Sequence, residues 1–168
     1  MDRGEQRVQS RLQATLDPSN WQTLTDRFAD GVGYATGIGY RTEEVLVIEA
    51  SSGGIDENKA HTAADSLKLL EMLTGVLRLR STRWKKASLQ TFTGVRALGI
   101  QTVVNTMTLI SVSLNNQQKY VYEELRHANI PATFDRRYDW VQIFELLACL
   151  FDILQDQKQL EKKLESEH

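Results

Sequence analysis

This chain contains a run of four aliphatic residues, Val45-Leu46-Val47-Ile48, with acidic residues on both sides. The run is short and rich in β-branched residues, and it is followed closely by Ser51-Ser52-Gly53-Gly54. This pattern is typical of a strand that is buried on both faces. We therefore expect residues 45–50 to form an interior strand of a sheet with helices packed against it.

The residues around this strand predict further helices and strands. Val8, Leu12 and Leu16 share one helical face and indicate a helix over residues 3–16. Glycines that alternate with apolar residues over 30–40 indicate a strand or hairpin. A helix from a capping box at Thr62 and Asp65 to about residue 79 is predicted from leucines at positions 67, 70, 73 and 77.

The second half of the chain is richer in strand-forming residues. The Val, Ile and Thr of 97–114 predict two strands that divide near Asn105 and Thr106, because 18 residues exceed one typical strand. Residues 119–130 predict a further strand, which Pro131 ends.

The most strongly patterned helix begins near residue 140. Six residues give this helix one apolar face at helical spacing: Trp140, Ile143, Phe144, Leu147, Phe151 and Leu154. Residues 156–168 are almost wholly polar, and we expect a frayed tail there. The whole pattern predicts a single α/β domain over residues 1–155, with a mixed central sheet flanked by helices.

Length and composition narrow the class of protein. With 168 residues and 41% hydrophobic side chains, the chain suits one domain with a core. No apolar run approaches 18 residues, and no apolar stretch follows the charged start, so we expect no transmembrane helix and no secretory signal. The single Cys149 excludes an internal disulfide and a cysteine-rich zinc site. We therefore expect an intracellular protein, in the cytoplasm or nucleus, without a membrane partner.

Two acidic residues are placed where they could bind a metal ion. Asp30 lies where a strand begins, and Glu49 lies near the end of the buried strand, where an unpaired charge is costly. Mg²⁺ prefers oxygen ligands and often takes only one or two protein carboxylates. With Glu5 from the first helix, these acids would form a site for phosphodiester hydrolysis. The alternative is that Glu49 caps the strand and Asp30 forms a turn before Gly31.

These residues resemble the layout of a known family. Asp30-Gly31, then the apolar strand ending in Glu49-Ala50-Ser51, then a helix, resemble the PD-(D/E)XK, or restriction-endonuclease-like, nucleases. The segments 97–104, 107–114 and 119–131 and the closing helix also resemble uncharacterised fungal proteins with a degenerate nuclease-like domain. The resemblance covers most of residues 5–155. It implies that Glu5, Asp30 and Glu49 are catalytic and that Asp30 and Glu49 bind Mg²⁺.

One position departs from the family pattern. The family's lysine, which the resemblance implies would position or activate the attacking water, is replaced here by Ser51. Some members carry this lysine in the following helix, where Lys59 is the nearest candidate. Lys59 is equally well placed to be a solvated residue ahead of that helix.

A basic segment follows the predicted second helix. Six residues there could contact nucleic acid: Arg78, Arg80, Arg83, Trp84, Lys85 and Lys86. Cations neutralise phosphates, and an aromatic ring can stack on an exposed base. The alternative is a helix C-terminus, where cations complement the helix dipole, followed by a loop that Trp84 anchors.

The sequence therefore leaves three functions open. The first is a nuclease-fold domain that hydrolyses phosphodiesters with Mg²⁺. The second is a non-catalytic member of the fold, a pseudoenzyme, that binds nucleic acid or a protein partner. The third is a homo-oligomer that self-associates through the helix from Trp140. The sequence does not decide whether the protein is an enzyme.

Overall fold

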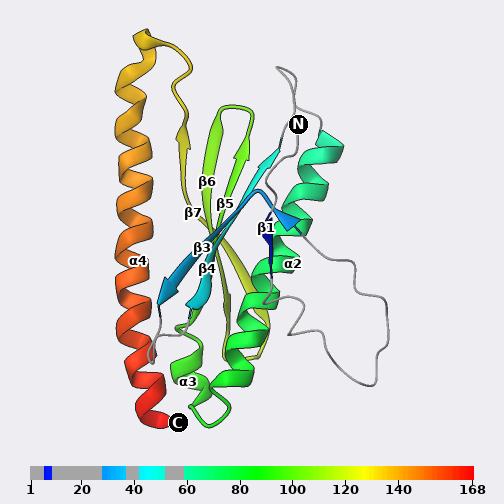
Figure 1. The fold of residues 1–168 in the computed structure, drawn as a ribbon, viewed down its shortest axis with the longest axis vertical. Coiled ribbons are helices and arrows are strands. Elements are labelled where there is room, and N and C mark those ends of the chain that lie inside the picture. Colours follow the sequence, from blue (N-terminus) through cyan, green and yellow to red (C-terminus); the bar gives the residue numbers. More distant parts are fainter. Residues whose placement is uncertain (1–5, 9–27, 37–41, 52–58) are drawn as a thin grey trace.

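The computed structural model describes residues 6–8, 28–36, 42–51 and 59–168 (Figure 1). The elements in these residues are β1 (Gln6–Arg7), β2 (Phe28–Ala29), β3 (Gly31–Thr36), β4 (Thr42–Ser51), α2 (Lys59–Arg83), α3 (Leu89–Phe92), β5 (Arg96–Val103), β6 (Thr106–Leu114), β7 (Tyr120–Asn129), the 3-10 helix η2 (Phe134–Asp139) and α4 (Trp140–Glu167).

Strands β3 to β7 form one mixed sheet in the order β3-β4-β5-β6-β7. Strands β4 and β5 are parallel, and the other neighbours are antiparallel. A parallel pair needs a long crossover connection, which contains α2 here. The expected interior strand is confirmed, because β4 lies between β3 and β5 and Val47 is fully buried. The protein is thus a mixed α/β fold.

The two long helices lie on opposite sides of the sheet (Figure 1). On the α2 side, Leu69, Met72 and Leu73 pack with Val47 and Ala97 in one buried cluster. Gly99 of β5 lets α2 approach closely, since a Cβ there would lie 3.0 Å from Leu73 Cδ1. On the α4 side, a second cluster contains Leu98, Ile100, Leu109, Ile143, Leu146 and Leu150.

The strands of the second half agree with the sequence pattern. Strands β5 and β6 are separated by a two-residue turn at Val104 and Asn105, where the division was expected. Strand β7 ends at Asn129, two residues before Pro131.

Helix α2 differs from the expected helix in its bounds and its buried face. Thr62 lies inside α2, so the predicted capping box is wrong. Leu67 is 58% exposed, and the fully buried positions are Leu69, Met72, Leu73, Val76 and Leu77. These positions recur at intervals of three and four, and the helix is rotated so that this stripe meets the sheet.

Helix α4 packs on the sheet through a stripe that only partly coincides with the predicted apolar face. Its buried residues are Ile143, Leu146, Leu150 and Leu164. Four residues of the predicted apolar face are exposed: Trp140 by 48%, Phe144 by 64%, Leu147 by 43% and Phe151 by 60%. The helix carries two apolar stripes, and the more aliphatic stripe meets the sheet.

The last residues of the chain are helical, so the expectation of a frayed tail is wrong. Helix α4 extends to Glu167, and Leu164 is only 2% exposed. The Glu167 carboxylate accepts hydrogen bonds from the Ser88 amide at 2.9 Å and the Thr91 hydroxyl at 2.7 Å. These bonds attach the end of α4 to the N-terminus of α3.

Most of the expected first helix lies outside the described residues, and so does Glu5. Where the structure describes this region, Gln6 and Arg7 form strand β1, which pairs with β2, so the helix prediction is wrong for these residues. Across the described residues, no helix is both long enough and apolar enough to cross a membrane.

Candidate acidic site

The centre of the candidate site is Glu49, a carboxylate buried near the end of β4. Its side chain is 2% exposed and faces α2. The Lys68 ammonium donates a hydrogen bond to Glu49 Oε2 at 2.9 Å and lies 2.9 Å from Oε1. Among the described residues, Oε1 accepts no well-directed hydrogen bond although it is buried. Both Glu49 oxygens therefore lie within ion-pair distance of Lys68, and Oε1 lacks a directed hydrogen bond.

The environment of Glu49 raises its pKa. Burial is the largest cause and raises the pKa above the ordinary value, whereas the hydrogen bond and the positive charge of Lys68 lower it. The negative charges of Asp30 and Asp65 raise the pKa of Glu49 further. Three carboxylates thus influence one another at this end of β4.

Asp30 is held beside Glu49 by the backbone of β4. It lies between β2 and β3, and its Oδ2 accepts a hydrogen bond from the Ala50 amide at 2.7 Å. Asp30 thus reaches across to the neighbouring strand, in contrast to the local turn that was the alternative. The structure therefore brings two of the predicted site residues, Asp30 and Glu49, to one place.

Polar side chains from α2 and β5 surround these acids. The Ser51 hydroxyl donates to Asp65 Oδ2 at 2.9 Å, so the residue at the family's lysine position contacts the helix. Gln101 is the β5 neighbour of Glu49 in the sheet, and its amide donates to the Ser66 hydroxyl at 2.8 Å. The site is therefore built from β4, β5 and the first half of α2.

Lys68 is the functional candidate that the sequence interpretation missed. The lysine that contacts Glu49 comes from the middle of α2, whereas the lysine considered there was Lys59, whose side chain lies outside the described residues. A signal for Lys68 was present. It follows Asp65 by three positions and precedes Met72 by four, so helical spacing places all three on one face.

Asp30 and Glu49 could hold a divalent cation only if few of its ligands came from the protein. Within the described parts of the chain, no group of three or more His, Cys, Asp or Glu side chains could hold an ion. Asp30 and Glu49 provide two carboxylates, and the buried Oε1 of Glu49 is a suitable hard ligand atom. Mg²⁺ commonly binds one or two carboxylates and completes its shell with water or substrate. The two residues fit such a site.

The basic segment does not form one continuous cationic face. Arg80 lies 3.9 Å from Glu43 Oε2 and donates to the Arg96 carbonyl at 3.3 Å, and Arg83 forms an ion pair with the same Glu43. Burial lowers the pKa of Arg80, against an opposing effect of Glu161. Glu43 therefore neutralises part of the charge that was predicted to attract phosphate.

The other residues of the basic segment have different surroundings. Arg78 donates to the Tyr120 hydroxyl at 3.2 Å and lies over its ring. Trp84 is partly buried and packs against the α2-side core, as the anchoring alternative expected. Lys85 and Lys86 are exposed in the turn after α2. Of the six residues of the basic segment, only these two lysines and Arg78 are exposed.

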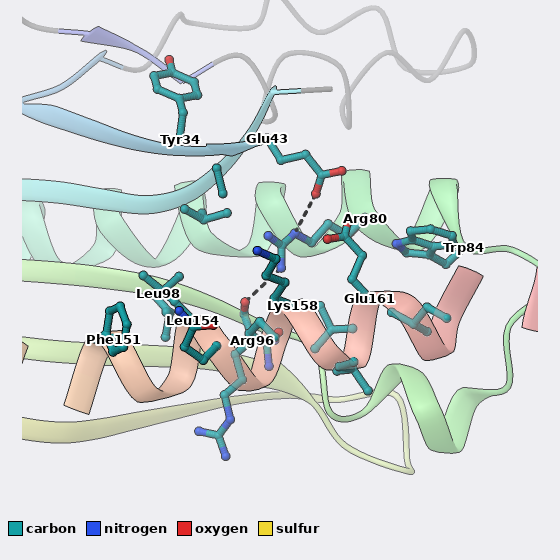
Figure 2. Close-up of a pocket in the computed structure, with 17 residues that line it drawn as sticks. Tyr34, Glu43, Arg80, Trp84, Arg96, Leu98, Phe151, Leu154, Lys158 and Glu161 are labelled. Carbon is teal, nitrogen blue, oxygen red and sulfur yellow. Dashed lines mark hydrogen bonds and ion pairs between the residues drawn. The ribbon is translucent and has the colours of Figure 1, made fainter. Parts of the chain in front are cut away.

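A cavity of about 340 Å³ lies at the opposite end of β4 from Glu49. Its walls come from β3, β4, β5, the end of α2 and the second half of α4 (Figure 2). Figure 2 shows the Glu43–Arg80 ion pair in the wall, with Leu154 and Phe151 on the α4 side. The cavity is separate from the acidic site.

Neither the family models, nor the curated proteins, nor the solved structures include a match to this chain, so its function has to be inferred from the acidic site and its surroundings.

Proposed function

We propose that this chain is a restriction-endonuclease-like domain that binds Mg²⁺ at Asp30 and Glu49 and acts on nucleic-acid phosphodiesters. The observation that carries this proposal is the convergence of Asp30, Glu49 and Lys68 at one end of β4. Two carboxylates and a lysine are the residue types that the family resemblance requires, and here the lysine comes from α2.

The order of elements supports the same proposal. Asp30 precedes β3, Glu49 lies near the end of β4, and α2 then leads to the parallel strand β5. The family resemblance rests on this layout, in which each of two neighbouring strands carries one acidic residue at an end and a helix follows the second strand. In this proposal Lys68 takes the role of the motif lysine that Ser51 replaces, because Ser51 contacts Asp65, which lies about one helical turn before Lys68 in α2.

Each side chain has a distinct role in this proposal. A bound Mg²⁺ supplies a Lewis acid that polarises the phosphodiester and lowers the pKa of its water. The Ala50 amide orients Asp30 through a hydrogen bond, and the Lys68 ammonium forms an ion pair with Glu49. The Lys68 side chain is 25% exposed, so its ammonium can donate to a phosphate oxygen or to the attacking water.

A second function is favoured by the same ion pair. The Lys68 ammonium lies 2.9 Å from both oxygens of Glu49, where a cation ligated by that carboxylate would compete with it. A lysine that takes the place of a metal ion would make the domain a non-catalytic member of the fold. Such a protein would bind its partner without cleaving it.

Calorimetric titration with Mn²⁺ and Mg²⁺ separates the two functions. We expect the wild-type chain to bind Mn²⁺ and Asp30→Asn to lose this binding, with Asp152→Asn as an exposed control. Lys68→Ala should retain metal binding but lose cleavage of single- and double-stranded DNA and RNA. If only Lys68→Ala binds metal, the non-catalytic function is correct. If neither protein binds metal, the acidic site is structural and the nuclease proposal is wrong.

Nucleic-acid binding can be tested independently of cleavage. Affinity should fall steeply with salt, by a slope of about −0.9 per phosphate contacted on duplex DNA. We expect Lys85→Ala with Lys86→Ala to reduce this slope, because both side chains are exposed. Arg80→Ala should leave the slope unchanged, since Arg80 is mostly buried and contacts the Arg96 carbonyl. Equal affinity at low and high salt would exclude this role for the segment.

A further inference from the structure

The cavity at the end of β4 opposite Glu49 is large enough to hold a small molecule. Its volume is about 340 Å³, whereas a water molecule occupies roughly 30 Å³ in the liquid. Protein interiors are close-packed and contain few voids larger than one water molecule. Ligand pockets have volumes on the order of 300–1,000 Å³. The size of the cavity therefore indicates a binding site for a small ligand and not a packing defect.

Much of the cavity wall is aliphatic. The side chains come from β4, β5, α4 and the residue before β5 (Figure 2). Six aliphatic residues contribute to it: Val45, Val95, Leu98, Leu154, Leu160 and Leu164. Three of these, Val95, Leu98 and Leu164, are almost fully buried. The apolar part of a ligand placed against them would leave water, which is favourable in proportion to the area covered.

The mouth of the cavity carries two aromatic rings and a lysine. Tyr34 and Phe151 line the cavity although they are 50% and 60% exposed, so they lie where it meets solvent. Lys158 follows Phe151 by seven positions, which places both residues on the same face of α4. Lys158 is exposed and has no hydrogen bond or ion pair with any described residue. Its ammonium is therefore available to a ligand.

A second cation, Arg80, lines the cavity from α2. Its side chain is only 15% exposed, and one terminal nitrogen donates to the Arg96 carbonyl at 3.3 Å. The buried Nε of Arg80 has no hydrogen-bond acceptor among the described residues, and Glu43 Oε2 lies 3.9 Å from it. Glu43 also forms an ion pair with Arg83. A buried charge is costly unless it is paired and hydrogen-bonded, so a further acceptor would stabilise Arg80.

The charges around the cavity leave one positive charge in excess. Five charged residues line it: Glu43, Arg80, Arg96, Lys158 and Glu161. The Arg96 guanidinium pairs with Glu123, and Glu43 pairs with Arg83, and neither partner belongs to the lining. Arg80 and Lys158 then remain against Glu161. A single carboxylate would balance this excess, whereas a phosphate monoester, with a charge of about −1.5 to −2, would exceed it.

We propose that this cavity binds a small apolar molecule that carries a single carboxylate. The apolar part of the ligand lies against the aliphatic wall, and its carboxylate pairs with Lys158 at the mouth and with Arg80. The proposal does not rest on the proposed nuclease function, because no residue of the acidic site lines the cavity.

Three probes with the same alkyl chain separate the contribution of the charge from that of the apolar wall: octanoate, octanol and octylamine. Two-dimensional NMR of the full chain follows its amide signals during titration with each probe. We expect octanoate to shift the signals of Leu98 and Leu154 and to leave those of Glu49 and Lys68 unchanged. Octanol should bind about tenfold more weakly, because it lacks the charge-assisted hydrogen bonds, and octylamine more weakly still.

Variants of α4 test the site itself. Lys158→Gln should weaken octanoate binding about tenfold but leave octanol binding unchanged, which a general structural effect would not do. Lys162→Gln is the matched control, since Lys162 is exposed on the same helix and lies outside the lining. Leu154→Trp should abolish binding of octanoate and octanol, because its larger side chain occupies the cavity. Circular dichroism checks that each variant keeps the fold.

Four results would overturn the proposal. They are the absence of octanoate binding, equal affinity for octanoate and octylamine, an octanoate affinity that Lys158→Gln does not change, and binding that persists in a folded Leu154→Trp protein.

Discussion

Among single residues, Glu49 should make stability depend on pH. Its pKa in the folded protein is raised above the ordinary value of 4.5, so the folded protein binds this proton more tightly than the unfolded chain. The contribution of Glu49 to the free energy of unfolding is therefore greatest below about pH 4.5 and is lost as the pH rises through the raised pKa.

We expect this loss to disappear in Glu49→Gln, which cannot ionise. The free energy of unfolding of the wild type, relative to that of Glu49→Gln, should decrease between acidic and neutral pH. Urea denaturation of both proteins at several pH values measures the difference. The control is Glu145→Gln, whose side chain is 57% exposed. A pH-independent difference would mean that Lys68 fully compensates the burial of Glu49.

Backbone strain at Val104 gives a second prediction for a single residue. Val104 has a positive φ of 52° in the turn between β5 and β6, a conformation that β-branched residues rarely adopt. Val104→Gly should raise the free energy of unfolding by about 1 kcal/mol, measured by thermal or urea denaturation. Gln118 also has a positive φ, of 59°, but it is not β-branched, so Gln118→Gly should gain less. A less stable Val104→Gly would contradict this explanation.

Residue patterns located two of the site residues but not the third. Asp30 and Glu49 could be predicted because each lies at a strand end that local sequence marks. Lys68 was missed although its spacing from Asp65 and Met72 carried a signal, because its direction depends on how α2 is rotated about its axis. The leucines at 67, 70, 73 and 77 suggested a rotation that points Lys68 away from the sheet. The observed stripe from Leu69 to Leu77 turns Lys68 toward Glu49.

Among the elements, strands were predicted more accurately than helix faces. Runs of β-branched residues and a turn at Val104-Asn105 define β4, β5 and β6 locally. Helix α4 carries two apolar stripes, and amphipathic spacing alone does not say which of them meets the sheet. The stripe with Trp140 and Phe144 has larger side chains, yet the aliphatic stripe is buried.

The end of α4 provides a prediction at the element scale. Leu164 is 2% exposed and packs in the α2-side core, so Leu164→Ala should lower the free energy of unfolding by about 2–4 kcal/mol. The exposed Gln159 on the same helix is the control, and Gln159→Ala should change stability by less than about 0.5 kcal/mol. Equal, small effects in urea denaturation would show that the last turns do not stabilise the fold.

For the whole molecule, the mixed α/β class could be predicted but the arrangement of strands could not. Alternating helical and strand patterns indicate the class. That β4 pairs with β5 in parallel depends on the path of α2 between them, which no local pattern specifies. The local patterns therefore predict the class but not the order of the strands in the sheet.

The parallel pairing of β4 with β5 divides the sheet into two parts, β3–β4 and β5–β7. We expect the two parts to unfold locally at different rates. Strands β5, β6 and β7 are joined by short turns, whereas β3 and β4 are attached to them only through the crossover that contains α2. Closing a long connection costs more chain entropy than closing a turn, so the β3–β4 part should open more readily. Native-state amide exchange should then be faster at Val32 and Leu46 than at Leu109 and Ile110. Because Asp30 directly precedes β3 and Glu49 lies in β4, a ligand bound to them would slow exchange in the part that opens first before it affected the rest of the sheet.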